Sequence, residues 1–298
     1  MLEGRQRSDA EGRKRLKQAL SERRAIIAPG AGNALTARVI EDLGYETIYV
    51  SGAGIANFYL GVPDIGLLTM TEIADTTSRI ADATTLPLIV DIDTGFGNAL
   101  NAGRAVKVIE RAGAAAVQIE DQVFPKKCGH FDGKEIVPLS EMLSKVHAAV
   151  DARNDQNLQV IARTDVRSVT SLSEALDRAA AFTEAGADMT FVEAPVSVEE
   201  IREIAKLEAP QMINLVVGGK TPMPSQQELR EMGFALVLYA NVALQAAVNA
   251  MQVVLTQLRD RGSIDGLDSM LATFAERQRI VGKPYFDELE ARYGAAER

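Results

Sequence analysis

Eight short apolar runs alternate with helical segments between residues 25 and 261. The runs are rich in Val and Ile, and they read as continuous apolar strands joined by helices. This pattern indicates a parallel sheet that is buried on both faces. Eight such units over roughly 235 residues fit a closed (β/α)8 barrel of the TIM type, an α/β fold, better than an open sheet. The predicted strands are 25–28, 47–50, 86–92, 115–120, 158–162, 189–192, 212–217 and 235–240.

The sequence divides into three parts around this barrel. Residues 1–24 are charged and favour a helix, and residues 25–262 form the predicted catalytic barrel without an internal linker. Residues 263–298 form a C-terminal extension with two helical pieces, about 268–280 and 284–293. Both pieces carry apolar faces that must pack against something. A neighbouring subunit is one candidate, so we expect the extension to serve oligomerisation.

Composition and charge exclude several classes of protein. The chain has 298 residues, of which 47% are hydrophobic, which is enough for a large core. A formal net charge of −9 argues against a surface for nucleic acid or anionic membranes. No apolar run approaches the roughly 18–20 residues of a membrane span. The N-terminus lacks the apolar segment of a secretory signal. A single cysteine excludes an internal disulfide and fits a reducing compartment, so we expect a cytoplasmic protein.

Carboxylates stand at the ends of several predicted strands. Asp91 and Asp93 end the third strand, Glu120 and Asp121 the fourth, and Glu193 the sixth. In a TIM barrel the active site lies at the carboxyl ends of the strands. Buried like charges repel and are costly to desolvate, and a divalent cation would resolve that conflict. Oxygen ligands without a His–Cys cluster point to Mg²⁺, or to Mn²⁺, rather than to zinc.

These charged residues also have structural alternatives. Asp91 and Asp93 could cap the following helix, and Glu120 could form a salt bridge to Arg163 within the barrel. Asp121 points away from Glu120, so a loop hydrogen bond is favoured for it. Arg163 could itself be structural, but an Arg at a strand end beside carboxylates suits bidentate capture of a substrate carboxylate.

The loop after the fourth strand carries the only cysteine of the chain, Cys128, and one of its two histidines, His130. Lys126 and Lys127 precede the cysteine directly. A lone cysteine is more often inert, but neighbouring cations lower the pKa of a thiol and favour the thiolate. After the second strand, the Ser51-Gly52 segment offers a hydroxyl and backbone N–H groups that could hold carboxylate oxygens, or it forms a plain turn.

Several ordered motifs surround these residues. They are Asp-Ile-Asp-Thr-Gly-Phe-Gly at 91–97, Ile-Glu-Asp-Gln at 119–122, Lys-Lys-Cys-Gly-His at 126–130 and Ala-Arg-Thr-Asp at 162–165, with Gly-Val-Pro-Asp at 61–64, Phe-Val-Glu-Ala-Pro at 191–195 and Gly-Gly-Lys-Thr-Pro at 218–222. Their order and spacing resemble the isocitrate lyase/phosphoenolpyruvate mutase superfamily from about residue 25 to residue 293. The chain is most similar to the group of 2-methylisocitrate lyase, 2,3-dimethylmalate lyase, oxaloacetate hydrolase and petal death protein.

The resemblance implies a metal site, a moving loop and an oligomer. Mg²⁺ would be bound directly by Asp91 and, through water, by Asp64, Asp93 and Glu120. The loop that holds Cys128 would be a mobile gate over the site. Similar proteins are homotetramers, built from dimers that swap their C-terminal helices, which would give the C-terminal extension a role.

The resemblance further implies an oxo-acid lyase that breaks a carbon–carbon bond. Its substrate would be a small 2-hydroxy di- or tricarboxylic acid of the methylisocitrate or alkylmalate type, and its products an α-keto acid and a carboxylic acid. Tyr49 is the candidate base, and Cys128 would protonate the carbanion as general acid. His130 and Lys126, with Lys127, would tune the thiol and close the loop. The other predicted substrate contacts are Ser51, Gly52, Ala53, Lys127, Gly129, Arg163, Glu193, Asn214 and Thr221.

Two departures from the family pattern leave the substrate open. Ala53 stands where many relatives have a second glycine, and Val216-Val217 stand where relatives often have a polar or acidic residue. One rival reaction is the hydrolysis of oxaloacetate to oxalate and acetate, which would use the same residues. A phosphonate-cleaving or mutase activity is disfavoured by Cys128. A non-enzymatic binding protein is disfavoured by the intact acidic set.

Overall fold

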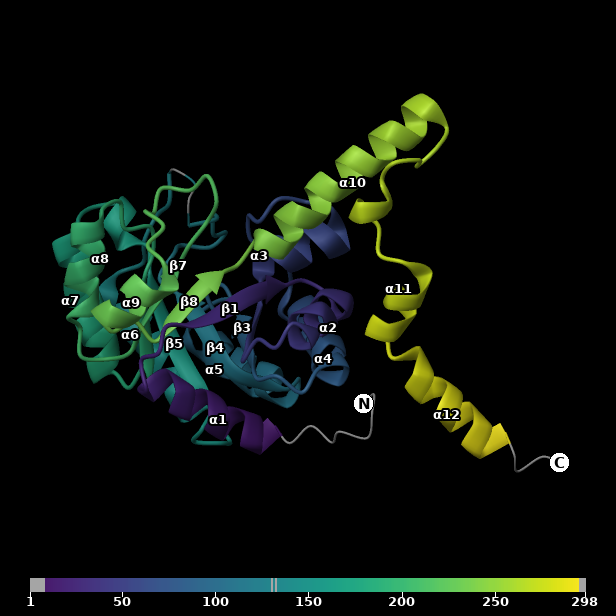
Figure 1. Ribbon diagram of the computed structural model, residues 1–298. Coiled ribbons are helices and arrows are strands. Elements are labelled where there is room, and N and C mark those ends of the chain that lie inside the picture. The colour runs from purple at the N-terminus through teal and green to yellow at the C-terminus, as the bar shows by residue number, and fades with distance from the viewer. Residues whose placement is uncertain (1–8, 130, 132, 295–298) are drawn as a thin grey trace.

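In the computed structural model, which describes residues 9–129, 131 and 133–294, eight parallel strands close into one barrel (Figure 1). Each strand pairs with the next in sequence, and β8 pairs with β1 through Ile26 and Leu236. The strands are β1 Ile26–Ala31, β2 Ile48–Val50, β3 Leu88–Asp91, β4 Ala114–Glu120, β5 Gln159–Thr164, β6 Met189–Val192, β7 Gln211–Asn214 and β8 Leu236–Tyr239. The predicted (β/α)8 fold is confirmed.

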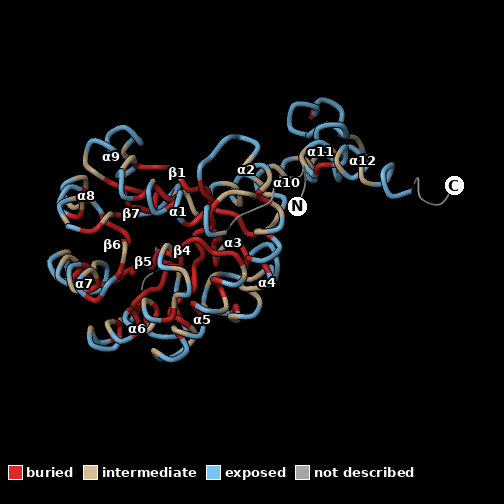
Figure 2. The backbone as a smooth tube through the Cα atoms, turned by 90° about the horizontal axis from the view of Figure 1, so that it is seen from below, coloured by how far each residue is buried: buried red, intermediate tan, exposed pale blue. Residues whose placement is uncertain are grey.

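Helices surround this barrel, and Figure 2 shows the buried strands inside a ring of more exposed helices. They are α2 Ala34–Asp42, α3 Gly52–Ile55, the π-helix η1 Ala56–Leu60, α4 Met70–Ala83, α5 Ala99–Arg111, α6 Leu139–Asp151, the 3-10 helix η2 Val166–Ser168, α7 Leu172–Glu184, α8 Val198–Ala205 and α9 Gln226–Met232. Most begin after a Ser, Thr or Asn whose side chain accepts a hydrogen bond from a backbone N–H of the first turn. Thr69 and Glu72 form a full capping box at α4.

The N-terminal helix α1, Asp9–Ser21, lies beneath the barrel (Figure 1). Leu16 and Leu20 on this helix belong to the same apolar cluster as the inward-facing strand residues. Arg13 fixes the helix in place, because its guanidinium donates to the backbone oxygens of Ala114 at 3.0 Å and Glu110 at 2.9 Å. The helix therefore closes the amino-terminal end of the barrel and leaves the carboxyl ends of the strands for a site.

The helix after β8, α10 Val242–Arg261, projects away from the barrel (Figure 1). The structure describes all of α10, and none of its residues is buried. The chain continues through the 3-10 helix η3 Asp268–Met270, α11 Phe274–Ile280 and α12 Lys283–Gly294. The chain thus projects from the barrel along α10. Among the described residues, no helix is both long and apolar enough to cross a membrane.

Candidate active site

A small cavity of about 40 Å³ lies among the carboxyl ends of the strands. Residues from β2 to β8 and from the loops that follow these strands line it. The lining residues are Tyr49, Ser51, Ala53, Asp64, Asp91, Lys126, Cys128, Gly129, Arg163, Glu193, Asn214, Val216, Leu238, Ala240 and Asn241. Most of the predicted site residues therefore meet in one place, at the end of the barrel where a TIM-barrel site is expected.

Asp91 and Asp93 lie side by side at the end of β3. The backbone N–H of Asp93 donates to Asp91 Oδ1 at 3.1 Å, and Asp93 adopts a left-handed backbone with φ of 48°. A Cβ atom at Gly52 would lie 3.3 Å from Asp91 Oδ2 and 3.5 Å from Asp93 Oδ1. Glycine at this position therefore lets the start of α3 approach both carboxylates closely. Gly52 itself is not among the described residues that line the cavity.

The ammonium group of Lys126 lies between two of the predicted metal ligands. Its Nζ atom is 2.6 Å from Asp64 Oδ1 and 2.9 Å from Asp93 Oδ1. Burial opposes the charge on Lys126, but Asp93 and Asp64 raise its pKa well above the usual value. Burial also raises the pKa of Asp93 to about 6; Lys126 opposes this effect, and Asp91 and Asp64 add to it. The buried negative charge is thus only partly compensated by the lysine.

The chemistry of this carboxylate group fits a hard divalent cation. Both carboxylate oxygens of Glu120 are buried and accept no hydrogen bond from the described residues. Burial raises the pKa of Glu120 well above its usual value, although Arg163 opposes this effect. Such oxygens suit Mg²⁺ or Mn²⁺. Within the described residues, no three His, Cys, Asp or Glu side chains are already arranged around a point as metal ligands. The four predicted ligands, Asp91, Asp93, Asp64 and Glu120, therefore stay a prediction.

Arg163 occupies the floor of the cavity, but its guanidinium fork is taken by Asp165. Arg163 Nε donates to Asp165 Oδ2 at 2.8 Å, and Nη2 donates to Asp165 Oδ1 at 3.0 Å. Its Nη1 atom lies 3.2 Å from Glu120 Oε2 and 3.7 Å from Glu193 Oε2. The predicted bidentate capture of a substrate by this fork therefore needs correction, because only the Nη1 edge faces other partners. The salt bridge between Glu120 and Arg163, one of the alternatives for Glu120, is present.

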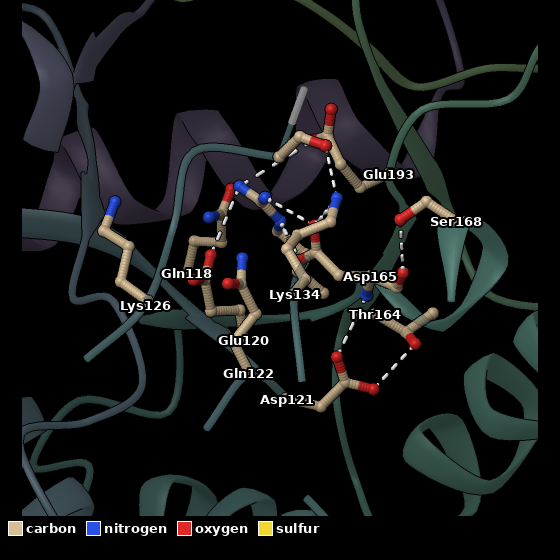
Figure 3. Close-up of polar contacts among 12 residues, drawn as sticks. Gln118, Glu120, Asp121, Gln122, Lys126, Lys134, Thr164, Asp165, Ser168 and Glu193 are labelled. Atoms are coloured by element: carbon tan, nitrogen blue, oxygen red, sulfur yellow. Dashed lines mark hydrogen bonds and ion pairs between the residues drawn. The ribbon is translucent and has the colours of Figure 1, made fainter. Parts of the chain in front are cut away.

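A supporting network beneath Arg163 was missed by the sequence analysis. Lys134 Nζ donates to Asp165 Oδ1 at 2.8 Å and also to the backbone oxygen of Gly129. Burial would raise the pKa of Asp165, but Arg163 and Lys134 hold it at about 2. Asp121 accepts hydrogen bonds from Thr164 Oγ1 at 2.7 Å and from the Asp165 N–H at 2.9 Å, as Figure 3 shows. Asp121 thus makes the loop hydrogen bonds that its orientation predicted, and Lys134 ties the cysteine loop to the floor.

The cysteine loop rests directly on this floor. Cys128 is half-buried and lines the cavity. At Gly129, a Cβ atom would lie 2.5 Å from Arg163 Nη2 and 2.6 Å from Glu193 Cγ. No other residue type fits there without moving these side chains, so glycine is required for the loop to come this close. The arrangement places the Cys128 thiol on the same cavity as the carboxylates and Arg163.

Lys127, the neighbour of Cys128, points elsewhere. Its backbone is clamped by Gln122, which accepts from the Lys127 N–H at 2.9 Å and donates to its carbonyl at 2.8 Å. The Lys127 ammonium donates to the Gly133 carbonyl at 2.6 Å and is exposed. The structure therefore does not bring Lys127 into the cavity as a substrate contact. His130 lies outside the described residues.

A family model described as phosphoenolpyruvate phosphomutase matches residues 16–259. The chain belongs to the phosphoenolpyruvate mutase/isocitrate lyase superfamily. The 2,3-dimethylmalate lyase of Eubacterium barkeri is 40% identical over 280 residues, which are 94% of this chain and 97% of that protein. The 2-methylisocitrate lyase of Salmonella typhimurium is 41% identical over 280 residues, covering 93% and 95%. These relatives are lyases, and the chain is a carbon–carbon lyase of this superfamily.

The solved structures extend the comparison to a hydrolase. Oxaloacetate acetylhydrolase in complex with the inhibitor 3,3-difluorooxalacetate superimposes with a TM-score of 0.89 and 31% sequence identity. The match covers 97% of this chain and 98% of that one. The superfamily barrel therefore supports more than one reaction, and the site rather than the fold must decide between them.

The structure also shows the surroundings of Tyr49, the candidate base. Its hydroxyl donates to Gln118 Oε1 at 2.9 Å, and Gln118 Nε2 donates to Asp91 Oδ1 at 3.4 Å. Burial raises the pKa of Tyr49 well above its usual value, and the charge of Asp91 adds to this effect. A neutral phenol donates a hydrogen bond and does not accept a proton. These surroundings, burial first and the charge of Asp91 second, therefore disfavour Tyr49 as a base.

The last predicted contacts lie at β7 and β8, where the structure also adds residues. Asn214 lines the cavity, whereas Thr221 is buried outside the lining. The side-chain oxygens of Asn214 and Asn241 are buried, and neither accepts a hydrogen bond from the part of the chain that is described. Sequence analysis did not select Leu238, Ala240 or Asn241. The strand-end rule that found the carboxylates applies to them too, because all three stand at or just after the end of β8.

Proposed function

We propose that the chain uses a divalent cation to cleave a 2-hydroxy di- or tricarboxylic acid of the methylisocitrate or alkylmalate type into an α-keto acid and a carboxylic acid. One observation carries this proposal. A single cavity joins the carboxylates Asp64 and Asp91, the guanidinium of Arg163 and the thiol of Cys128. This set offers cation ligands, an anion contact and a proton donor, which are the groups that such a cleavage needs.

The cation would be held by Asp91 together with Asp64, Asp93 and Glu120. Mg²⁺ is the expected ion and Mn²⁺ a substitute, because the ligands are all oxygen atoms. When bound, the cation supplies positive charge that lowers the pKa of the substrate hydroxyl and stabilises the α-keto acid. The ammonium group of Lys126 would then face Asp64 and Asp93 from the side of the cysteine loop.

The remaining steps fall to the side chains around the cavity. Tyr49 is proposed to accept the hydroxyl proton in its phenolate form, which positive charge held at Asp91 would favour. As that proton leaves, the hydroxyl oxygen forms a carbonyl, and the electron pair of the broken carbon–carbon bond passes to the carboxylic acid fragment. Arg163 Nη1 and Asn214 would stabilise the resulting enolate. Cys128 would then protonate its carbon, with His130 and Lys126 keeping the loop closed.

Contacts to the substrate carboxylates are also expected along the second strand and the loop. Ser51 would use its hydroxyl, and Gly52, Ala53 and Gly129 would use their backbone. Glu193 and Thr221 complete the proposed contacts from β6 and from the segment after β7. Closure of the loop over these groups would exclude water and protect the enolate. A reactive thiol at Cys128 would stay reduced in the cytoplasm, where we place the protein.

Removing divalent cations is expected to lower the rate of cleavage by at least about 100-fold, the effect of removing one preorganised charge from an active site. Production of α-keto acid should stop after dialysis against EDTA and return when Mg²⁺ or Mn²⁺ is added. Asp91→Asn should weaken Mn²⁺ binding measured by electron paramagnetic resonance. Asp75→Asn is the matched control, because Asp75 is half exposed on α4 and pairs with Arg79 at 2.8 Å. Full activity in EDTA would contradict the cation requirement.

Oxaloacetate hydrolysis to oxalate and acetate is the second candidate reaction. The likeness to oxaloacetate acetylhydrolase supports it. An assay of methylisocitrate, isocitrate, dimethylmalate, citramalate and oxaloacetate separates the two reactions by product. Release of pyruvate or glyoxylate supports the lyase, and release of oxalate supports the hydrolase. A phosphonate-cleaving or mutase activity has less support, because Cys128 lines the cavity.

We also propose that the arm formed by α10, α11 and α12 packs on a second copy of the chain, in a homotetramer built from dimers that swap this arm. The support is the exposure of large apolar residues along it. Met251, Leu255, Phe274 and Phe286 are between 49% and 72% exposed. A helix with this many exposed apolar residues normally has a partner. Light scattering on the full chain tests the tetramer, and a monomer at micromolar concentration would refute it.

A further inference from the structure

One buried cation close to the site has no part in the proposed chemistry. Lys134 lies on the segment between β4 and α6, and its side chain is only 2% exposed. It is not among the described residues that line the cavity. Its ammonium group donates to Asp165 Oδ1 at 2.8 Å and also to the backbone oxygen of Gly129 (Figure 3). Burying an ammonium group is costly unless its charge is paired, so the contact with Asp165 makes this position possible.

The carboxylate that receives Lys134 is itself held in place. Asp165 is fully buried just after β5, and it accepts two hydrogen bonds from Arg163. Its backbone N–H donates to Asp121 Oδ1 at 2.9 Å. Three hydrogen bonds that do not involve Lys134 therefore fix Asp165, and they give the ammonium group an attachment point on the barrel.

Hydrogen bonds hold the loop backbone on both sides of Cys128. On one side, Gln122 accepts from the Lys127 N–H at 2.9 Å and donates to the Lys127 carbonyl at 2.8 Å. On the other side, Lys134 donates to the Gly129 carbonyl. Gln122 stands two residues after β4, and Lys134 is tied to the end of β5, so both contacts connect the loop to the barrel. The position of the thiol thus depends on both contacts.

We propose that Lys134 is a positioning residue that keeps the Cys128 thiol at the cavity, acting through the Gly129 carbonyl and the Asp165 carboxylate. The proposal rests on the proposed lyase function, in which Cys128 protonates the enolate. Without the ammonium group, the Gly129 carbonyl loses this donor and the segment loses its tie to β5. Asp165 would keep both bonds from Arg163, so the anion contact on the cavity floor would stay. Loss of Lys134 should therefore impair proton transfer far more than substrate binding.

Lys134→Met is expected to lower kcat by about 100-fold, the effect of moving a reacting group by about 1 Å. KM should change by less than about threefold, because the carboxylates and Arg163 keep their places. Both constants are measured with the compound of the proposed panel that is cleaved fastest. Lys145→Met is the matched control, because Lys145 is an equally buried lysine, 3% exposed, that pairs with Glu141 at 3.4 Å on α6. It should keep the wild-type kcat.

The rate at which iodoacetamide labels the protein is a second readout that needs no substrate. Cys128 is the only cysteine of the chain and is half-buried, so mass spectrometry of the whole chain follows this thiol alone. Labelling should be at least about 10-fold faster in Lys134→Met, because a hydrogen bond to a charged group stabilises the docked loop by about that factor. It should stay unchanged in Lys145→Met. Lys134→Gln keeps a donor without the charge, and it should change both readouts in the same direction.

Wild-type labelling rates in both Lys134 variants would overturn the inference and leave the lyase function standing. A normal kcat with a raised KM would also overturn it, because Lys134 would then act on substrate binding. If the wild type cleaves none of the compounds, the lyase function fails, and the labelling rates alone decide whether Lys134 positions the thiol. Thermal melting checks that the variants fold. Loss of the fold in both would overturn the inference, because Lys134 would then be a structural residue.

Discussion

Cys128→Ser is expected to lower the rate of carbon–carbon cleavage by about 10²–10⁴-fold, the range for loss of a general acid. A serine hydroxyl is close in size to the thiol but is a far weaker acid, so it cannot deliver a proton to the enolate. The position of the loop should not change, because Gly129 fits against Arg163 and Glu193 through its backbone. Single-turnover formation of the carboxylic acid product measures the effect, and thermal melting monitors the fold.

The loop offers a matched control for this experiment. Lys127→Met changes the neighbouring residue, whose ammonium binds the Gly133 carbonyl away from the cavity. It should alter the free energy of unfolding by less than about 0.5 kcal/mol and keep most of the activity. Full cleavage by Cys128→Ser would remove the general-acid role. Equal loss of activity in both variants would show that the position of the loop, and not proton donation, limits the reaction.

The barrel could be predicted because parallel strands buried on both faces appear in the sequence as continuous apolar runs. The predicted range 189–192 coincides with β6. The Ser51-Gly52 segment after β2 was expected to hold carboxylate oxygens or to form a plain turn. It forms α3 and η1 instead, because Ser51 Oγ accepts from the Gly54 N–H at 3.1 Å and Ile55 is fully buried in the core. Tertiary packing outweighed the local preference there.

The destination of α10 was not predictable in the same way. Its apolar residues indicate a buried helix, and a helix after β8 would ordinarily cover the barrel. The sequence does not distinguish burial on its own barrel from burial on another subunit. The position of α10, which projects from the barrel with no buried residue along its described length, shows only that it does not cover its own barrel.

It was easier to predict which residues lie at the site than which hydrogen bonds and ion pairs they form. Asp91, Arg163 and Glu193 were found because residues at the carboxyl ends of barrel strands must face one another. Lys126 and Asp64 come from different loops, so their contact depends on how both loops fold. Lys127 was taken as a substrate contact from its place beside Cys128, but its ammonium binds Gly133 instead. Nearness in sequence did not determine the direction of its side chain.

Arg163→Lys should impair both stability and catalysis. Lysine cannot reproduce the two bonds to Asp165 or the contact of the guanidinium with the Phe191 ring, whose centroid is 5.3 Å away. It leaves Asp165 and Glu120 buried with fewer partners. We expect a loss of about 1–3 kcal/mol in the free energy of unfolding and at least about a 100-fold loss in kcat/KM. Urea unfolding and steady-state kinetics at neutral pH measure the two effects.

The effect on stability should also depend on pH, with a sign set by Asp165. Its pKa in the folded chain is about 2, below the usual 3.8, so its ion pairs stabilise the fold above pH 4 and are lost as the pH falls towards 2. The stability gap between Arg163→Lys and the wild type should therefore narrow in that range. Arg167→Lys is the matched control, because Arg167 donates hydrogen bonds of 2.9 and 2.6 Å to the carboxylate of Glu200 outside the cavity. That partly exposed pair should contribute at most about 1 kcal/mol and leave kcat unchanged. Equal losses in the two variants would mean that Arg163 is a structural residue and has no part in the reaction.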